Sequence, residues 1–203
     1  MKIIDYKNDD RWELCDQHHK SSCVVPNWFI GLLYREYDNI KNISDIKHSV
    51  ETGTHRGYTT EFLCKHFKNV YSIEKYPDQN YYGDTSLREV YKRLEEENSN
   101  LFINIGDSAE ILPVILKAHP DNPFVFIFDA HNGPDGPLLE ELSIVATTSN
   151  NKEHVIIIDD WGDFVSQHDT IKSKIYSINS KYHIEESSFG RCGILIAYIG
   201  KNE

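Results

Sequence analysis

Short apolar runs alternate with amphipathic segments from Asp45 to the end of this sequence, and this alternation restricts the fold more than any other feature. It is typical of a mostly parallel β-sheet covered by helices on both faces. We therefore predict an α/β fold with seven strands. The expected strands are 47–52, 69–74, 101–107, 123–131, 154–160, 182–187 and 193–199, and the expected helices are 57–67, 84–97, 108–117, 138–147 and 167–178.

Two features of these runs indicate how the strands are arranged. The run 123–131 is the most apolar, as expected of a central strand that is buried on both faces. The last two strands are joined by the short segment 188–191. A parallel return would need a longer crossover, so we expect the sheet to end in an antiparallel hairpin.

Residues 1–44 differ from the rest of the chain. They are polar at first and then amphipathic, with Trp28, Leu32 and Leu33 at the spacing of one helical face. We predict an N-terminal helical arm or cap at 1–44 and one domain at 45–203, because this length suits a single core. The arm either packs on the edge of the sheet or caps the functional site, and its aromatic side chains suit both roles.

The chain has 21 basic and 32 acidic residues and a formal net charge of −11 at pH 7. Such a surface repels polyanions, so DNA and RNA are disfavoured as partners. No apolar run approaches the about 18 residues that span a bilayer, and the N-terminus lacks the apolar region of a signal peptide. We therefore expect a cytoplasmic protein without a membrane partner.

The cysteines lack the spacing of a disulfide framework, so free thiols are expected. Cys15, His18, His19 and Cys23 nevertheless offer four soft metal ligands within nine residues. Zinc sites use these residue types, but the usual paired spacing is absent here. An ordinary polar segment is favoured, and a zinc site stays open as the alternative.

The stretch 49–60 combines a strand end, a glycine-containing turn and the start of a helix. Gly53 and Gly57 permit unusual dihedral angles and a close approach of the backbone to a ligand. The first turn of the helix has unpaired N–H groups that attract carboxylate or phosphate. Together with the acidic Glu51, this stretch predicts the site of a nucleotide-type cofactor.

Five predicted strands in succession end in polar or acidic residues. In an open parallel sheet, ligands bind beyond the carboxyl ends of the strands, near the point where the strand order reverses. One acid at such a place is ordinary capping or solvation, but a row of them predicts a shared functional rim. The members of this rim are Glu51, Glu74, Asp107, Asp129, His131, Asp159 and Asp160.

The order of these motifs resembles that of class I S-adenosylmethionine-dependent methyltransferases, over residues 46–199. The motifs are E-T-G-T-H-R-G at 51–57, V-Y-S-I-E at 70–74, G-D-S-A at 106–109, F-D-A-H at 128–131 and I-D-D at 158–160. The closing antiparallel hairpin is also typical of this family, whose Rossmann-like methyltransferase sheet the resemblance implies. The family usually has a further glycine at the position of His55, so a wider turn or a lower cofactor affinity is expected.

The resemblance implies roles for the residues near the ribose and the adenine of the cofactor. Glu74 would accept hydrogen bonds from both ribose hydroxyls, a task that suits a carboxylate with two acceptor oxygens. Asp107 and Ser108 would meet the adenine, with Asp107 accepting a hydrogen bond from its amino group.

The same resemblance implies that the backbone at Gly53, Thr54 and Gly57 passes close to the methionine part of the cofactor. Glu51 would orient this turn or face the positively charged end of the cofactor. Asp129 is a further candidate for a cofactor contact, without a metal ion.

Asp129, Asp159 and Asp160 resemble the three-acid arrangement of metal-dependent O-methyltransferases that act on sugars or other small hydroxylated molecules. The resemblance implies Mg²⁺, which prefers oxygen ligands and would lower the pKa of a bound hydroxyl. His131, together with Asp129, forms the predicted catalytic set, because a neutral imidazole can act as general base. The alternatives are a helix N-cap at Asp160 and a structural, hydrogen-bonded His131.

We therefore predict an enzyme that transfers a methyl group from S-adenosylmethionine to a hydroxyl of a small molecule, with a sugar or glycan as the favoured acceptor. Homo-oligomerisation is left open. The alternatives are a hydroxylase or another small-molecule enzyme on the same scaffold, and a protein that binds S-adenosylmethionine without catalysis. A nucleic-acid methyltransferase is disfavoured by the charge and by the absence of an Asn/Asp-Pro-Pro-aromatic motif.

Overall fold

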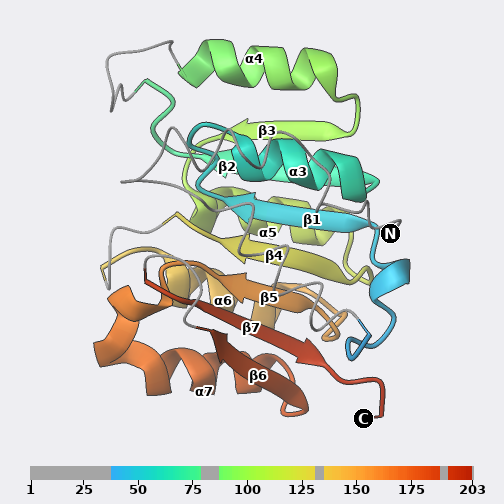
Figure 1. Ribbon diagram of the computed structural model, residues 1–203, viewed down its shortest axis with the longest axis vertical. Coiled ribbons are helices and arrows are strands. Elements are labelled where there is room, and N and C mark those ends of the chain that lie inside the picture. Colours follow the sequence, from blue (N-terminus) through green and yellow to red (C-terminus); the bar gives the residue numbers. More distant parts are fainter. Residues whose placement is uncertain (1–37, 79–86, 131–134, 188–191, 203) are drawn as a thin grey trace.

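The computed structural model describes residues 38–78, 87–130, 135–187 and 192–202 (Figure 1). A seven-stranded sheet lies in the middle, with the strand order β3-β2-β1-β4-β5-β7-β6. The strands are β1 (His48–Thr52), β2 (Asn69–Glu74), β3 (Leu101–Ile105), β4 (Phe124–Phe128), β5 (Val155–Ile158), β6 (Tyr182–Ser187) and β7 (Ile194–Ile199). The predicted α/β fold with seven strands is confirmed.

The first five strands are parallel. β1 pairs with β2 and β4, β2 pairs with β3, and β4 pairs with β5, all in parallel register. β7 pairs antiparallel with both β5 and β6, so the predicted C-terminal hairpin is also confirmed. As a result, the carboxyl ends of β1 to β5 meet at one edge of the sheet.

Helices cover both faces of the sheet (Figure 1). The helices α3 (Tyr58–His66) and α4 (Leu87–Glu97) lie over one face, and α5 (Ser108–Ala118), α6 (Leu138–Thr148) and α7 (His168–Ile178) lie over the other. The predicted bounds agree to within a few residues, although the predicted start of α4 lies outside the described residues. Among the helices of the described ranges, none is long and apolar enough to cross a membrane.

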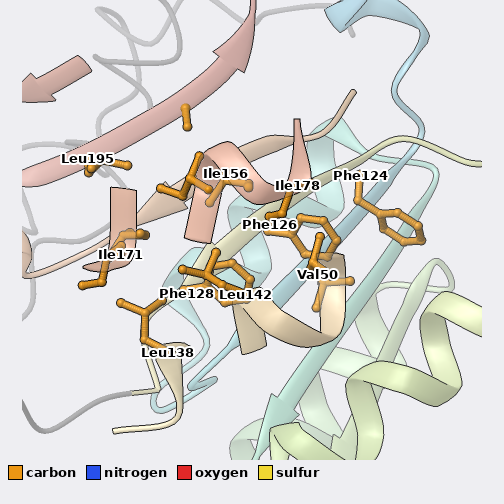
Figure 2. Packing of buried hydrophobic residues seen from close by; sticks show 14 of the residues in the cluster. Val50, Phe124, Phe126, Phe128, Leu138, Leu142, Ile156, Ile171, Ile178 and Leu195 are labelled. Carbon is orange, nitrogen blue, oxygen red and sulfur yellow. The ribbon is translucent and has the colours of Figure 1, made fainter. Parts of the chain in front are cut away.

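The core beneath α5, α6 and α7 is built around one face of β4 (Figure 2). Phe124, Phe126 and Phe128 are buried there, with neighbouring ring centroids 5.5 and 5.6 Å apart. They pack with apolar residues of β1, β5, β7 and the three helices, including Val50 and Leu142. Burial of such a side chain contributes about 2–3 kcal/mol. All residues of β4 are buried, as predicted for a central strand.

Residues 38–47 lead into β1 along the C-terminal strand. Ile40 forms an antiparallel bridge with Gly200, and Ile40 and Ile43 are buried in the apolar cluster beneath α3 and α4. The segment before β1 therefore packs against the same sheet. The division into an arm at 1–44 and a domain at 45–203 stays a prediction, because residues 1–37 lie outside the described part, including the expected arm helix and the candidate zinc ligands.

Two 3₁₀ segments of the described residues have no counterpart in the sequence prediction. They are η2 (Ile43–Asp45), before β1, and η3 (Trp161–Gln167), between β5 and α7. The Trp161 N–H donates to Gly193 O at 2.9 Å, and the indole Nε1 donates to Glu186 Oε2 at 2.9 Å. The Trp161 ring stacks on His168, with centroids 3.8 Å apart. These contacts, together with the burial of Trp161 and Phe164 in the apolar core, hold η3 in place.

A buried histidine lies at the amino-terminal edge of the sheet, opposite the carboxyl ends. His154 immediately precedes β5 and is 1% exposed. Its Nδ1 accepts a hydrogen bond from Phe124 N at 3.1 Å, whereas its Nε2 is buried without a partner. Burial, and then the positive charge of Lys152, lower the pKa of His154 to about 3. The folded protein therefore keeps this imidazole neutral.

The substitution His154→Asn should reduce the loss of stability in mild acid. Below pH 6.5 the unfolded chain binds a proton at His154 and the folded chain does not, so the wild type loses stability as the pH falls. Between pH 7 and pH 5 the wild type should lose about 2 kcal/mol more of its unfolding free energy than the variant, as measured by urea denaturation. Equal losses in the two proteins would contradict a neutral buried His154.

Candidate functional site

The carboxyl ends of the parallel strands meet at one edge, where the strand order reverses between β1 and β4. Backbone hydrogen bonds join the strand ends there. Gly53 N donates to Ile73 O at 2.9 Å, and Asp129 N donates to Thr52 O at 3.0 Å. Ligands of open α/β sheets bind at such a reversal. The predicted site residues that the structure brings to this edge are Glu51, Gly53, Thr54, Gly57, Glu74, Asp107, Ser108, Asp129, Asp159 and Asp160.

The turn after β1 requires glycine at two positions. Gly53 has a φ of +85°, and a Cβ atom there would lie 2.5 Å from Asp129 O. Gly57 has a φ of +73°, precedes α3 as its N-cap residue, and leaves no room for a Cβ atom beside the Leu94 side chain. The backbone therefore approaches β4 on one side and α4 on the other.

His55 adopts the left-handed conformation between these glycines, with a φ of 44°. This conformation favours glycine, so the left-handed backbone of His55 is less favourable than that of its two glycine neighbours in the turn. Two hydrogen bonds hold the residue: its N–H donates to Glu74 Oε2 at 3.0 Å, and its carbonyl accepts from Tyr91 Oη at 2.8 Å. The turn is closed by a hydrogen bond from Gly57 N to Thr54 O at 2.8 Å.

Glu51 lies beneath this turn in a buried hydrogen-bond network. Its Oε2 accepts from Thr60 Oγ1 at 2.5 Å and from Ser72 Oγ at 2.6 Å. The Thr54 hydroxyl lies 2.7 Å from that of Ser72. Burial raises the pKa of Glu51 to about 7, although the two hydroxyl hydrogen bonds oppose this shift. Glu51 therefore links β1, β2, the turn and the first turn of α3.

Glu74 is the last residue of β2 and lies beside the turn. Its Oε2 accepts from the His55 N–H, and its Oε1 accepts from Tyr76 N at 2.8 Å. Each carboxylate oxygen can accept more than one hydrogen bond. The carboxylate is thus held in one orientation by the backbone and can still accept hydrogen bonds from a ligand.

Asp107 lies beyond the end of β3 and caps α5. Its Oδ1 accepts from Ala109 N at 3.0 Å, and its Oδ2 accepts from Lys75 Nζ at 2.6 Å. The Lys75 ammonium, and then the Ala109 N–H, lower the pKa of Asp107. Ser108 follows as the first residue of α5 and is buried. An adenine amino group at Asp107 would therefore share the carboxylate with Lys75.

Asp129 and Asp159 follow β4 and β5 directly. Burial raises the pKa of Asp129 well above its ordinary value, and the negative charge of Asp159 adds to the shift, followed by those of Glu51, Asp160 and Glu74. Burial also raises the pKa of Asp159. Carboxylates are thus concentrated at the point of strand reversal, where they disfavour further negative charge and favour a cation.

Asp160 has a left-handed backbone, with a φ of 45°, and occupies the N-cap position of η3 without a side-chain cap hydrogen bond. Within the ranges that the structure describes, no group of three His, Cys, Asp or Glu side chains is arranged to hold a metal ion. The three-acid Mg²⁺ site at Asp129, Asp159 and Asp160 is not shown. His131 lies outside the described residues, so its role as general base stays a prediction.

Several supporting residues were missed by the sequence prediction. Ser72 and Thr60 bind Glu51, Tyr91 binds the turn, and Lys75 binds Asp107. A serine inside the apolar run 69–74 was the only local signal for Ser72. Thr60, Tyr91 and Lys75 lie on other segments, and the sequence does not show how close these segments come to the site in the fold.

Comparisons with known proteins place the fold among solved structures. No protein-family model matches the chain, and no curated protein matches it. Precorrin 8W decarboxylase from Methanobacterium thermoautotrophicum is similar with a TM-score of 0.56 and 16% identity, over 89% of this chain and 92% of that one. An rRNA methylase from Streptococcus thermophilus gives a TM-score of 0.53 at 13% identity, over 87% and 99%.

A Streptococcus mutans protein solved in complex with SAH gives a TM-score of 0.50 at 15% identity, over 83% of this chain and 96% of that one. At these identities the similarity concerns the fold alone. The chain shares the Rossmann-like methyltransferase fold, with its seven-stranded sheet and its C-terminal antiparallel hairpin.

Proposed function

We propose that this protein is an S-adenosylmethionine-dependent methyltransferase. The observation that carries the proposal is the convergence of the glycine turn 53–57 with Glu74 and Asp129 at the strand reversal. The glycines bring the turn against β4 and α4 beside Glu74, and the acids suit a ligand with hydroxyl groups and a positive charge. S-adenosylmethionine combines these features.

When bound, S-adenosylmethionine supplies a methyl group on a positively charged sulfur. Glu74 would bind the ribose hydroxyls, because the His55 and Tyr76 N–H groups already orient its carboxylate. The backbone at Gly53 would face the methionine part. Asp129 would lie near the positive charge, which its carboxylate stabilises. The turn, Glu74 and Asp129 would then contribute mainly by holding the cofactor in the orientation that transfer to an acceptor requires.

The proposed acceptor is a hydroxyl group of a small molecule, with a sugar as the favoured class. His131, two residues after Asp129 in the sequence, would take the hydroxyl proton as the oxygen forms its bond to the methyl carbon and the carbon–sulfur bond breaks toward sulfur. The net charge of −11 opposes an RNA substrate, although one similar fold belongs to an rRNA methylase.

The second part of the proposal is that Mg²⁺ binds at this site and assists the methyl transfer. Its support is chemical: Asp129 and Asp159 are neighbouring carboxylates that repel each other, and a divalent cation would relieve this repulsion. Because the described residues contain no three-ligand cluster, we assign no step of the reaction to a metal ion.

Calorimetric titration should show binding of S-adenosylhomocysteine to the wild type. The variant Glu74→Gln should bind about 10-fold or more weakly, because one charged acceptor of the ribose hydroxyls is lost. Glu96→Ala, on the exposed side of α4, should bind like the wild type and serves as the control. Absence of binding to the wild type at millimolar ligand would reject the methyltransferase proposal.

Added Mg²⁺ should raise the melting temperature of the chelator-treated wild type and should not raise that of Asp159→Asn. A cation that binds only the folded state stabilises it, and this readout needs no acceptor substrate. Asp163→Asn removes an exposed acid nearby on η3 and should respond like the wild type. An equal response of Asp159→Asn, or none in the wild type, would reject the metal site.

His131→Ala should lower turnover by about 100-fold or more with little change in the affinity for S-adenosylhomocysteine. The loss of a general base slows proton removal without affecting cofactor binding. The measurement is S-adenosylhomocysteine formation with sugar acceptors, and His183→Ala, an exposed histidine on β6, is the control. An unchanged rate would remove His131 from this role, whereas binding without turnover of any acceptor would favour a non-catalytic binding protein.

A further inference from the structure

A buried acid lies directly behind the proposed cofactor edge. Glu141, on α6, is 1% exposed, and its carboxyl group lies beside the hydroxyls of Thr52 and Ser108. Thr52 is the last residue of β1 and immediately precedes the glycine turn. Ser108 is the first residue of α5 and immediately follows Asp107. One side chain therefore lies between two of the segments that form the proposed site.

The stability of the fold does not account for an acid at this position. Glu141 Oε1 and Thr52 Oγ1 are both buried without a hydrogen-bond partner of good geometry, and such a group costs about 1–3 kcal/mol. The neighbours Leu138 and Leu142 on the same helix belong to the apolar core. A leucine of similar size at position 141 would avoid the cost of burying a carboxyl group.

The surroundings of Glu141 act on its pKa in opposite directions. Burial raises its pKa to about 7, and the negative charges of Asp107 and Glu140 act in the same direction. The hydroxyls of Ser108 and Thr52 act in the opposite direction, because they favour the charged form.

We propose that Glu141 is a positioning residue of the cofactor site, which sets the spacing between the turn after β1 and the N-terminus of α5. It acts through Thr52 and Ser108 and is too deeply buried to touch the cofactor itself. This inference rests on the proposed function, since it concerns the same site. Binding sites of this kind need their parts held to within about 0.5 Å, which a contact between two elements can supply.

The test compares Glu141→Leu with Glu141→Gln in two measurements, thermal unfolding without ligand and titration with S-adenosylhomocysteine. Glu141→Leu should melt at or above the temperature of the wild type, yet bind the ligand about 10-fold or more weakly. Glu141→Gln should stay within about 3-fold of the wild type, because the amide has nearly the same size and remains polar. Glu140→Gln, the exposed neighbour, should behave like the wild type.

A double-mutant cycle tests whether Glu141 acts through Thr52. The near-isosteric Thr52→Val should weaken binding, and combining it with Glu141→Leu should cause no further loss, because both remove the same link. The proposal is overturned if Glu141→Leu binds like the wild type, if it is unstable, or if the effects of the two substitutions add. A wild type that does not bind S-adenosylhomocysteine rejects the proposed function instead, and this inference with it.

Discussion

The contact between the Gly53 backbone and the Asp129 carbonyl determines the geometry of the whole carboxyl edge. A Cβ atom at Gly53 would lie 2.5 Å from this oxygen, so any side chain would push the ends of β1 and β4 apart. The strand order reverses at this same place, and the glycine turn, Glu74 and Asp129 take their relative positions from it. The apolar core fixes the strands, whereas this glycine fixes how closely their ends approach.

Two buried acids support this edge from opposite faces of β1. Successive residues of a strand point to opposite faces, so Glu51 extends toward α3 while its neighbour Thr52 extends toward Glu141 on α6. The pKa of each acid is raised to about 7, so each contributes stability that is lost as the pH rises from about 4.5 through 7. His154 has the opposite dependence. His154 at the amino-terminal edge therefore lowers the free energy of unfolding in acid. Glu51 and Glu141 at the carboxyl edge lower it at neutral pH and above.

The sequence was sufficient for the strands and most helices, because buried parallel strands are continuous apolar runs and their helices have a periodic apolar face. It was insufficient where distant contacts decide the structure. The segment η3 is held by Gly193 and Glu186, and the acid of Asp107 caps α5 while it pairs with Lys75. The sequence places Glu141 in the predicted helix 138–147, and only the folded structure shows that this acid is buried.

The pairing of Ile40 with Gly200 fixes the edge of the sheet at which the described chain begins. β7 runs antiparallel to β5, so its last residue, Ile199, lies at the amino-terminal edge of the parallel strands. The chain thus joins the described fold at the edge opposite the glycine turn. The length of β1, about 17 Å for five residues of extended chain, therefore separates the described start of the chain from the glycine turn.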